Sequence, residues 1–403
     1  MRVRLIAALL LLFLAGCSEA PEQTSVLQQD HAALQKAAAG TEVRWHMWGG
    51  SAQINQWVDT YVASEMKRRF GVTVTRVPMD APVFVNKLLT EKAANKTQGT
   101  MDLLWINGEN FKNAQQAGVL FGPFADRLPN FTAYCDPAKS AFDFGFPVNG
   151  YEAPYGQAQF VFEYDQERTP VPPASLDDLK AWIMAHPGRF TYPEPPDFTG
   201  SAFLRHVFCA ATGGHEQYMA GFDAALYAKN APQAFAWLRE VQPYLWQEGK
   251  TYPKDAAALD TLFARGEIDM GMSYHPAHAQ MKSLEKTYPD TVRTFVLADG
   301  AIYNIHFTAI PFNAPNKAGA MVLANFLLSP EAQLSKFKPE NWGDMPALDM
   351  TKLSAADQAA FKAVDLGPAT LDAGTLASRA MPEIPSQYLE VLEKDWSRIV
   401  LGK

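Results

Sequence analysis

The stretch Trp45-His46-Met47-Trp48-Gly49-Gly50-Ser51 joins a short apolar run to a long amphipathic one. Residues 43–48 predict a buried strand, Ser51 is a residue type that caps helix N-termini, and the apolar spacing over 54–70 predicts a helix. Glycines let a ligand approach the backbone, and in open α/β sheets ligands bind at the carboxyl ends of strands. The turn therefore predicts one wall of a ligand cleft, and the alternative is a plain connection capped by Ser51.

The same alternation of strand and helix continues to residue 118. Strands are predicted over 72–77 and 101–106, with a helix over 84–94 between them. Asn107-Gly108-Glu109-Asn110 then turns into another helix. Three successive βα units favour a parallel sheet with right-handed crossovers.

A second α/β region follows a helix-poor segment. Residues 156–164 alternate like a strand and are a natural crossing between two domains. Beyond them, Asp197-Phe198-Thr199-Gly200-Ser201 predicts a helix start. Further strands are predicted over 189–192, 268–273, 292–297 and 302–310, and a last helix over 386–401.

The N-terminus predicts export. A basic start, Met1-Arg2-Val3-Arg4, precedes an apolar run over 5–14 and the sequence Leu14-Ala15-Gly16-Cys17. This pattern is similar to a bacterial lipobox, which implies a signal peptide over 1–16, lipidation of Cys17 and a lipidated tether over 17–40. The alternative is an ordinary secretory signal that contains a cysteine. Two acyl chains would anchor the protein at a membrane surface.

Composition and cysteine content limit the class of partner and the redox state of the protein. The chain has 403 residues, a net charge of −8 and no basic stripe, which argues against a nucleic-acid partner. Cys135 and Cys209 remain after lipidation of Cys17, and in an oxidising compartment they form either a disulfide or two buried thiols. The sequence leaves both alternatives open.

Four segments together resemble the solute-binding proteins of bacterial ABC transporters, which have the type II two-lobed periplasmic-binding fold. They are Trp48–Ser51, 101–111, 197–203 and 324–333. The nearest resemblance is to a subgroup related to thiamine, iron and polyamine receptors. It implies two α/β lobes, each with a mostly parallel sheet flanked by helices, and a ligand cleft between them. The implied boundaries are lobe one at 41–155 with 305–403 returning to it, lobe two at 160–300, and hinge crossings near 153–165 and 298–308.

The resemblance also implies partners. The protein would be a monomeric, membrane-anchored receptor that delivers its ligand to permease subunits. The sequence carries no P-loop, so the ATPase would be a separate chain, and no cofactor is expected.

If the fold is right, ligand contacts lie on loops that face the cleft. The candidates are Trp48, Gly49, Gly50, Ser51, Asn107, Glu109 and Asn110 in lobe one, Tyr155, Gln157 and Asn304 in the crossings, and Asp197, Thr199, Gly200, Ser201, Ser273 and Tyr274 in lobe two. Ser51 and Ser201 are equally well explained as N-caps. Trp48 has no helical face to pack on and is expected to stack on a flat or cationic ligand.

The ligand class has more than one interpretation. Glu109 and Asp197 put negative charge on both lobes and, with the aromatic candidates, favour a small polar or cationic organic ligand, thiamine- or polyamine-like. The alternative uses helix N-termini to hold an oxyanion, and a ferric-ion receptor is also open. The run from Gly271 to His275 resembles a nucleophile elbow but lacks its second glycine, so a secreted hydrolase is a further alternative. His275 and His278 offer two metal ligands without a third.

Overall fold

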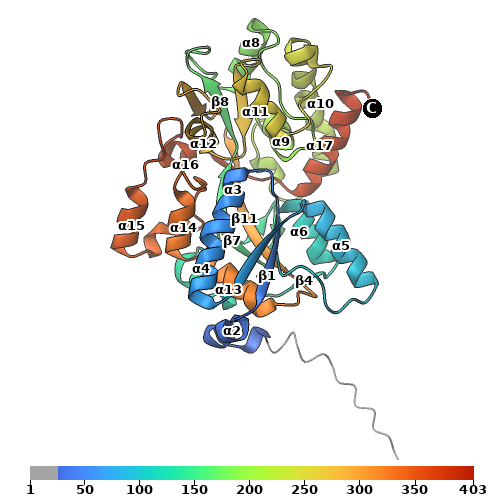
Figure 1. The fold of residues 1–403 in the computed structure, drawn as a ribbon. Coiled ribbons are helices and arrows are strands. Elements are labelled where there is room, and N and C mark those ends of the chain that lie inside the picture. Colours follow the sequence, from blue (N-terminus) through green and yellow to red (C-terminus); the bar gives the residue numbers. More distant parts are fainter. Residues whose placement is uncertain (1–25) are drawn as a thin grey trace, which may run out of the picture.

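The computed structural model describes residues 26–403, which form two α/β lobes (Figure 1). The predicted signal peptide and Cys17 lie outside the described residues. Within the described part of the chain, no helix combines the length and the apolar character that crossing a bilayer requires.

The first lobe is built on the predicted βα units. Strand β1 (Glu42–Met47) pairs in parallel with β2 (Thr73–Pro78) and with β3 (Leu103–Ile106), so that Trp45 lies opposite both Arg76 and Leu103. The sheet order is β12-β11-β3-β1-β2, and β4 (Leu120–Phe121) and β7 (Glu152–Gln159) also pair with β11 (Ala301–Pro311). The helices that follow the first three strands are α3 (Ala52–Trp57), the π-helical turn η1 (Val58–Val62), α4 (Ala63–Phe70), α5 (Ala81–Ala93) and α6 (Gly108–Gln116).

Apolar side chains cover both faces of this sheet. Trp45 and Met47 point into one core, and Leu104 and Ile106 belong to the core on the other face. Two helices from late in the chain, α13 (Lys317–Leu327) and α14 (Pro330–Phe337), add apolar residues to the first of these cores. Both faces of the sheet are buried. The positions left for a ligand are the carboxyl ends of β1 and β3 and the turns that follow them.

The segment expected to be a tether contains a packed helix. Helix α2 (His31–Ala38) lies against α13, with Leu34 and Ala38 fully buried. His31 also lies 3.2 Å from the side-chain amide of Asn325 (Nε2 to Nδ2). The prediction of a tether is therefore wrong for 31–38, because two apolar residues one helical turn apart suffice to seat this helix.

The second lobe has an antiparallel sheet. Strand β8 (Val161–Asp165) lies between β9 (Met270–Ser273) and β10 (Val292–Phe295), and both pairings are antiparallel. The prediction of a mostly parallel sheet is wrong for this lobe. The strand predicted over 189–192 is irregular, although the carbonyl of Arg189 accepts a hydrogen bond from the N–H of Asp269. The lobe contains α8 (Leu176–Ala185), α9 (Phe198–Ala211), η3 (Glu216–Tyr218), α10 (Ala224–Val241), η4 (Gln242–Tyr244), η5 (Trp246–Gly249), α11 (Ala256–Ala264) and α12 (His278–Leu284).

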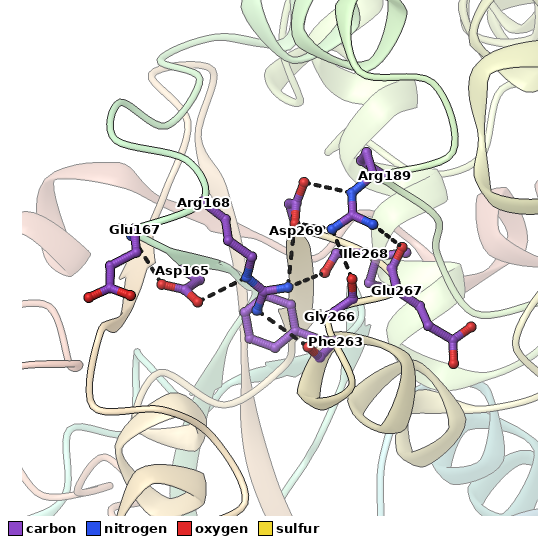
Figure 2. Close-up of polar contacts among 9 residues, drawn as sticks. All are labelled: Asp165, Glu167, Arg168, Arg189, Phe263, Gly266, Glu267, Ile268 and Asp269. Atoms are coloured by element: carbon purple, nitrogen blue, oxygen red, sulfur yellow. Dashed lines mark hydrogen bonds and ion pairs between the residues drawn. The ribbon is translucent and has the colours of Figure 1, made fainter.

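Side-chain contacts, and not a ladder of backbone hydrogen bonds, hold the irregular segment that begins at Arg189 (Figure 2). The Arg189 guanidinium donates to both carboxylate oxygens of Asp269 at 2.5 and 2.8 Å, and Arg168 reaches the same carboxylate at 3.4 Å. The two guanidinium groups also donate to backbone carbonyls in the last turn of α11 and just after it, at Phe263, Gly266, Glu267 and Ile268. These bonds satisfy carbonyls that the end of a helix leaves unpaired.

The chain passes between the lobes three times. β7 leads into β8, β10 leads back into β11, and β12 (Ala380–Pro382) leads into α17 (Ser386–Ile399). Helix α17 packs on α9 and α10, and its Tyr388, Leu392 and Trp396 lie in the core of the second lobe. The prediction that all of 305–403 returns to the first lobe is wrong for this helix. The remaining elements are η2 (Ala125–Arg127), α7 (Pro129–Tyr134), β5 (Phe142–Asp143), β6 (Phe146–Pro147), η6 (Met350–Lys352), α15 (Ala355–Lys362) and α16 (Ala373–Arg379).

Cys135 and Cys209 are free thiols, so of the two alternatives the disulfide is wrong. Each is 1% exposed, Cys135 in the core of the first lobe and Cys209 in that of the second, and a bond cannot join two separate cores. Burial raises the pKa of the Cys135 thiol to about 12 and that of Cys209 further.

We expect both thiols to resist alkylation in the folded protein and to react once urea unfolds it, since a buried, protonated thiol is a poor nucleophile. Peptide mass mapping after iodoacetamide treatment at neutral pH measures this. Recovery of a peptide that links the two cysteines would contradict the structure.

Candidate functional site

The two lobes meet at a short hairpin formed by β5 and β6, referred to below as the hairpin. Its strands pair Phe142 with Pro147 and Asp143 with Phe146. The turn residue Phe144 reaches the second lobe, where its carbonyl accepts a hydrogen bond from the N–H of Ser386 at 3.3 Å. The hairpin therefore bridges the first lobe and the start of α17.

The turn after β3 supports the hairpin from the first lobe. Asn107 precedes α6, and its side chain donates to the carbonyl of Ile305 at 2.5 Å and accepts from the indole N–H of Trp105 at 3.1 Å. The N–H of Gly108 donates to the Asp143 carboxyl at 2.5 Å. Burial raises the pKa of Asp143 to about 8, although this hydrogen bond lowers it. The turn and the hairpin are thus one hydrogen-bonded unit.

The start of α9 forms the facing wall in the second lobe. The Asp197 carboxylate accepts hydrogen bonds from the N–H groups of Thr199 and Gly200 at 2.9 and 3.0 Å, which caps the helix. Gly200 is required here because a Cβ would collide with the carbonyl of Pro193. Ser201 does not cap the helix, and its hydroxyl donates to Glu393 on α17. Within the predicted segment 197–201, Phe198 reaches the first lobe, where its ring lies 6.4 Å from that of Phe144, and Asp197 takes the capping role.

A buried ion pair lies behind this wall. The Arg205 guanidinium donates two hydrogen bonds of 2.7 Å to the Glu383 carboxylate, and the Tyr274 hydroxyl donates to the same carboxylate at 2.6 Å. The ring of Tyr274 lies 5.1 Å from that of Phe198, measured between centroids. Tyr274, a predicted ligand contact, therefore packs against the start of α9. Its contacts with Glu383 and Phe198 were not predictable from the sequence.

Carboxylates from both lobes gather beside the hairpin. Glu109, in the first turn of α6, has its pKa raised by burial and by the charge of Glu390 on α17. The pKa of Glu393 is also raised, by burial first and by Glu109 and Glu390 in addition. Lys112 approaches Glu390 at 3.9 Å, a long distance for an ion pair. This part of the interface is therefore acidic. Asn110 lies half-buried in the same turn of α6.

The Trp48–Ser51 turn lies at the surface of the first lobe. Trp48 is 47% exposed, and its indole lies over Gly50, where any Cβ would collide with it. Gly49 passes close to Pro78, whose Cβ would be 2.7 Å from a Cβ at that position. The Ser51 hydroxyl accepts from the N–H of Ile54 at 3.3 Å, so Ser51 caps α3. An exposed indole at a strand exit is available to a ligand.

The candidate ligand residues in the two crossings, Tyr155, Gln157 and Asn304, lie in the hinge strands β7 and β11. Tyr155 is 1% exposed and lies among Trp45, Trp105 and Trp342, with ring centroids 5.6–6.2 Å away. Gln157 donates to the carbonyl of Pro346 at 2.9 Å. Tyr155 is therefore closed to a ligand, whereas Gln157 is only partly buried. Asn304 and Ser273 are also buried, and the side-chain oxygen of Asn304 has no hydrogen-bond partner among the described residues.

The histidines of the 271–275 and 275–278 motifs are engaged elsewhere. His275 accepts a hydrogen bond from the N–H of Ala277 at 3.0 Å, and Ser273 belongs to β9 opposite Val161. The ring of His278 lies 2.7 Å from Glu163 (Nδ1 to Oε1) and 3.2 Å from Asp260 (Nε2 to Oδ2). The structure does not assemble a nucleophile with a base from these residues.

His278 gives the protein a predictable pH dependence. Burial alone would lower its pKa, but the charges of Asp260 and Glu163 outweigh burial and raise it to about 10. A folded-state pKa above the unfolded value of about 6.5 stabilises the fold below pH 6.5, and this stability is lost as pH rises towards 10. We expect the wild type to lose on the order of 2 kcal/mol more than His278→Gln between pH 6.5 and 9.5 in urea unfolding. Parallel curves for the two proteins would contradict this.

Comparison with known proteins identifies the family. Residues 60–363 match the family of bacterial extracellular solute-binding proteins. The chain belongs to this family. This solute-binding protein is 36% identical over 368 residues to Protein YnjB of Escherichia coli (strain K12), which covers 90% of this chain and 92% of YnjB.

Solved structures agree on the fold of the solute-binding protein. A periplasmic thiamin binding protein is similar with a TM-score of 0.60 and 18% identity, over 89% of this chain and 96% of that one. PotD, the spermidine/putrescine ABC transporter substrate-binding protein from Streptococcus pneumoniae, is similar with a TM-score of 0.62 and 14% identity, over 89% and 99%. The predicted resemblance and the two-lobed type II fold are confirmed. The protein is therefore an extracellular solute-binding protein with this fold.

Proposed function

We propose that this receptor captures a small polar or cationic organic molecule between its lobes and delivers it to the permease of an ABC importer. Glu109 and Glu393 carry the proposal: they come from opposite lobes, burial raises the pKa of both, and the charge of Glu390 raises both further, as does that of Glu109 for Glu393. A bound cation would relieve that repulsion and hold the lobes together. Thiamin and spermidine, which name two of the structural relatives, both carry positive charge.

The oxyanion alternative finds less support. An anion at a helix N-terminus needs free N–H groups. At α9 the Asp197 carboxylate already takes those of Thr199 and Gly200, and at α3 Ser51 takes that of Ile54. Lipidation of Cys17, a monomeric state and membrane anchoring belong to the same proposal and rest on the sequence pattern.

A thermal-shift screen tests the proposed function. The panel contains thiamine, spermidine, ferric citrate, sulfate, phosphate and glucose, and a chromogenic ester is assayed in parallel. We expect an organic cation to raise the melting temperature and the ester to stay intact. A rise with sulfate or phosphate alone would favour the oxyanion alternative, and turnover of the ester without any shift would favour the hydrolase.

Trp48→Ala is expected to weaken binding of the solute found in that screen by about 1–3 kcal/mol, since we infer that this exposed indole at the carboxyl end of β1 stacks on a cation or a flat ring. Isothermal titration calorimetry measures the change. Trp182→Ala on α8, where the indole stacks on His186 in the second lobe, is the matched control and should leave affinity unchanged. Equal affinities for all three proteins would remove Trp48 from the site.

A further inference from the structure

Phe144 occupies a slot between the lobes. Its ring is 5% exposed although it sits at the tip of a surface hairpin. A Cβ at Gly108 would lie 3.2 Å from the ring, and the Arg205 guanidinium lies over it, 5.4 Å from the ring centroid. The ring of Phe198, 6.4 Å away, contacts its edge. The slot therefore has one wall from the first lobe and two from the second.

The hairpin holds the backbone of Phe144 in an unfavourable conformation. Phe144 has φ 45°, a left-handed value that costs energy for a residue with a side chain, and Gly145 follows with φ 71°. Only two residue pairs join the strands of the hairpin. Release of Phe144 alone would relieve this backbone strain and break the hydrogen bond between its carbonyl and the N–H of Ser386, while Asp143 stays bonded to Gly108, so the ring is a replaceable occupant.

The walls of the slot suit an aromatic ring. Arg205 is fully buried, and two hydrogen bonds to Glu383 fix the plane of its guanidinium over the ring. A guanidinium over a ring face and a ring at its edge are both favourable aromatic contacts. Phe198 is 48% exposed, so this wall of the slot also faces solvent. The acidic residues Glu109 and Glu393 lie at the same interface.

We propose that this slot is the aromatic subsite of the ligand cleft, and that Phe144 occupies it until an aromatic ring of the ligand takes its place. The inference rests on the proposed function in one respect, that the ligand enters between the lobes. It narrows the ligand class to a cation that carries a flat aromatic ring, and excludes an aliphatic polyamine as the preferred solute.

Two amines of similar size and equal charge test the slot without knowledge of the natural ligand. Benzylamine carries an aromatic ring, and cyclohexylmethylamine carries its saturated counterpart. In Phe144→Ala the slot is empty, and we expect benzylamine to bind roughly fivefold more tightly than to the wild type and roughly fivefold more tightly than cyclohexylmethylamine. Ligand-observed NMR titration measures both ratios. Phe142→Ala is the matched control, because Phe142 lies on the same hairpin but is 60% exposed, and it should behave as the wild type.

Three results would overturn the inference. They are equal binding of the two amines to Phe144→Ala, weaker benzylamine binding by Phe144→Ala than by the wild type, and the same gain in Phe142→Ala. Circular dichroism checks that Phe144→Ala is folded, and Phe144→Val carries the same comparison if it is not. Failure of the proposed function is seen separately, as the absence of any stabilising solute for the wild type in the thermal-shift screen.

Discussion

Replacing Glu383 by Gln is expected to lower the free energy of unfolding by about 3–5 kcal/mol, because it leaves the Arg205 charge buried without its partner. The Arg205 side chain is 0% exposed and that of Glu383 is 3% exposed, so water cannot take the place of the lost carboxylate. The Tyr274 hydroxyl loses a charged acceptor in the same change. Urea unfolding followed by circular dichroism measures the loss.

Glu390→Gln is the matched control for Glu383→Gln. Glu390 also lies at the interface between the lobes, but it is 48% exposed and its Lys112 partner is 3.9 Å away. We expect a change within about 0.5 kcal/mol, as is usual for exposed ion pairs. Similar losses for the two variants would mean that Arg205 and Glu383 are solvated and that the slot wall is not rigid.

Replacing Asp344 by Asn is expected to destabilise the first lobe by a similar amount, about 3–5 kcal/mol. The Lys336 ammonium lies 2.7 Å from the Asp344 carboxylate, and both side chains are 1% exposed. His306 contacts the other carboxylate oxygen at 3.1 Å. Burial alone would raise the pKa of Asp344, but Lys336 and His306 outweigh burial and lower it. The variant removes the negative charge that this buried ammonium requires.

The double variant Lys336→Met with Asp344→Asn separates charge from packing. It removes both charges, so we expect it to recover much of the loss, since an apolar Met beside the Tyr155 and Trp342 rings, which the Lys336 ammonium now contacts, needs no counter-charge. Asp290→Asn, at an ion pair that is 76–80% exposed, should leave the urea midpoint unchanged. A double variant as unstable as Asp344→Asn would show that packing, and not an unpaired charge, causes the loss.

The parts of the fold that were predictable depend on local sequence. The units around β1, β2 and β3 follow from apolar runs, glycine stops and capping residues close together in the chain. The antiparallel pairing of β8 could not be predicted from local sequence. Its partners β9 and β10 lie more than 100 residues later, and nothing within β8 specifies their direction. Helix α17 has an amphipathic pattern that predicts a helix, but the pattern does not tell which lobe the helix packs on.

The site was predictable only at its turns. Asn107, Asp197 and Tyr274 follow or precede regular elements, and they lie where the lobes meet. Tyr155 lies inside β7, not at a turn, and strand alternation places its side chain on the inner face, in the core. Phe144, Arg205 and Glu383 carry no local signal: one is an ordinary turn residue, one lies inside a helix, and one follows a proline. Their roles arise from contacts that span 178 residues between Arg205 and Glu383.

The three crossings have a mechanical consequence. At the hinge β11 pairs with β7 along one edge and with β12 along the other, so the crossings lie side by side in one hydrogen-bonded ribbon. Such a ribbon bends across its strands by small dihedral changes in each, whereas sliding one strand past another would break several ladder bonds at once. We therefore expect the two lobes to open by rotation about a single axis. Helix α17 should move with the second lobe, although it comes from the end of the chain.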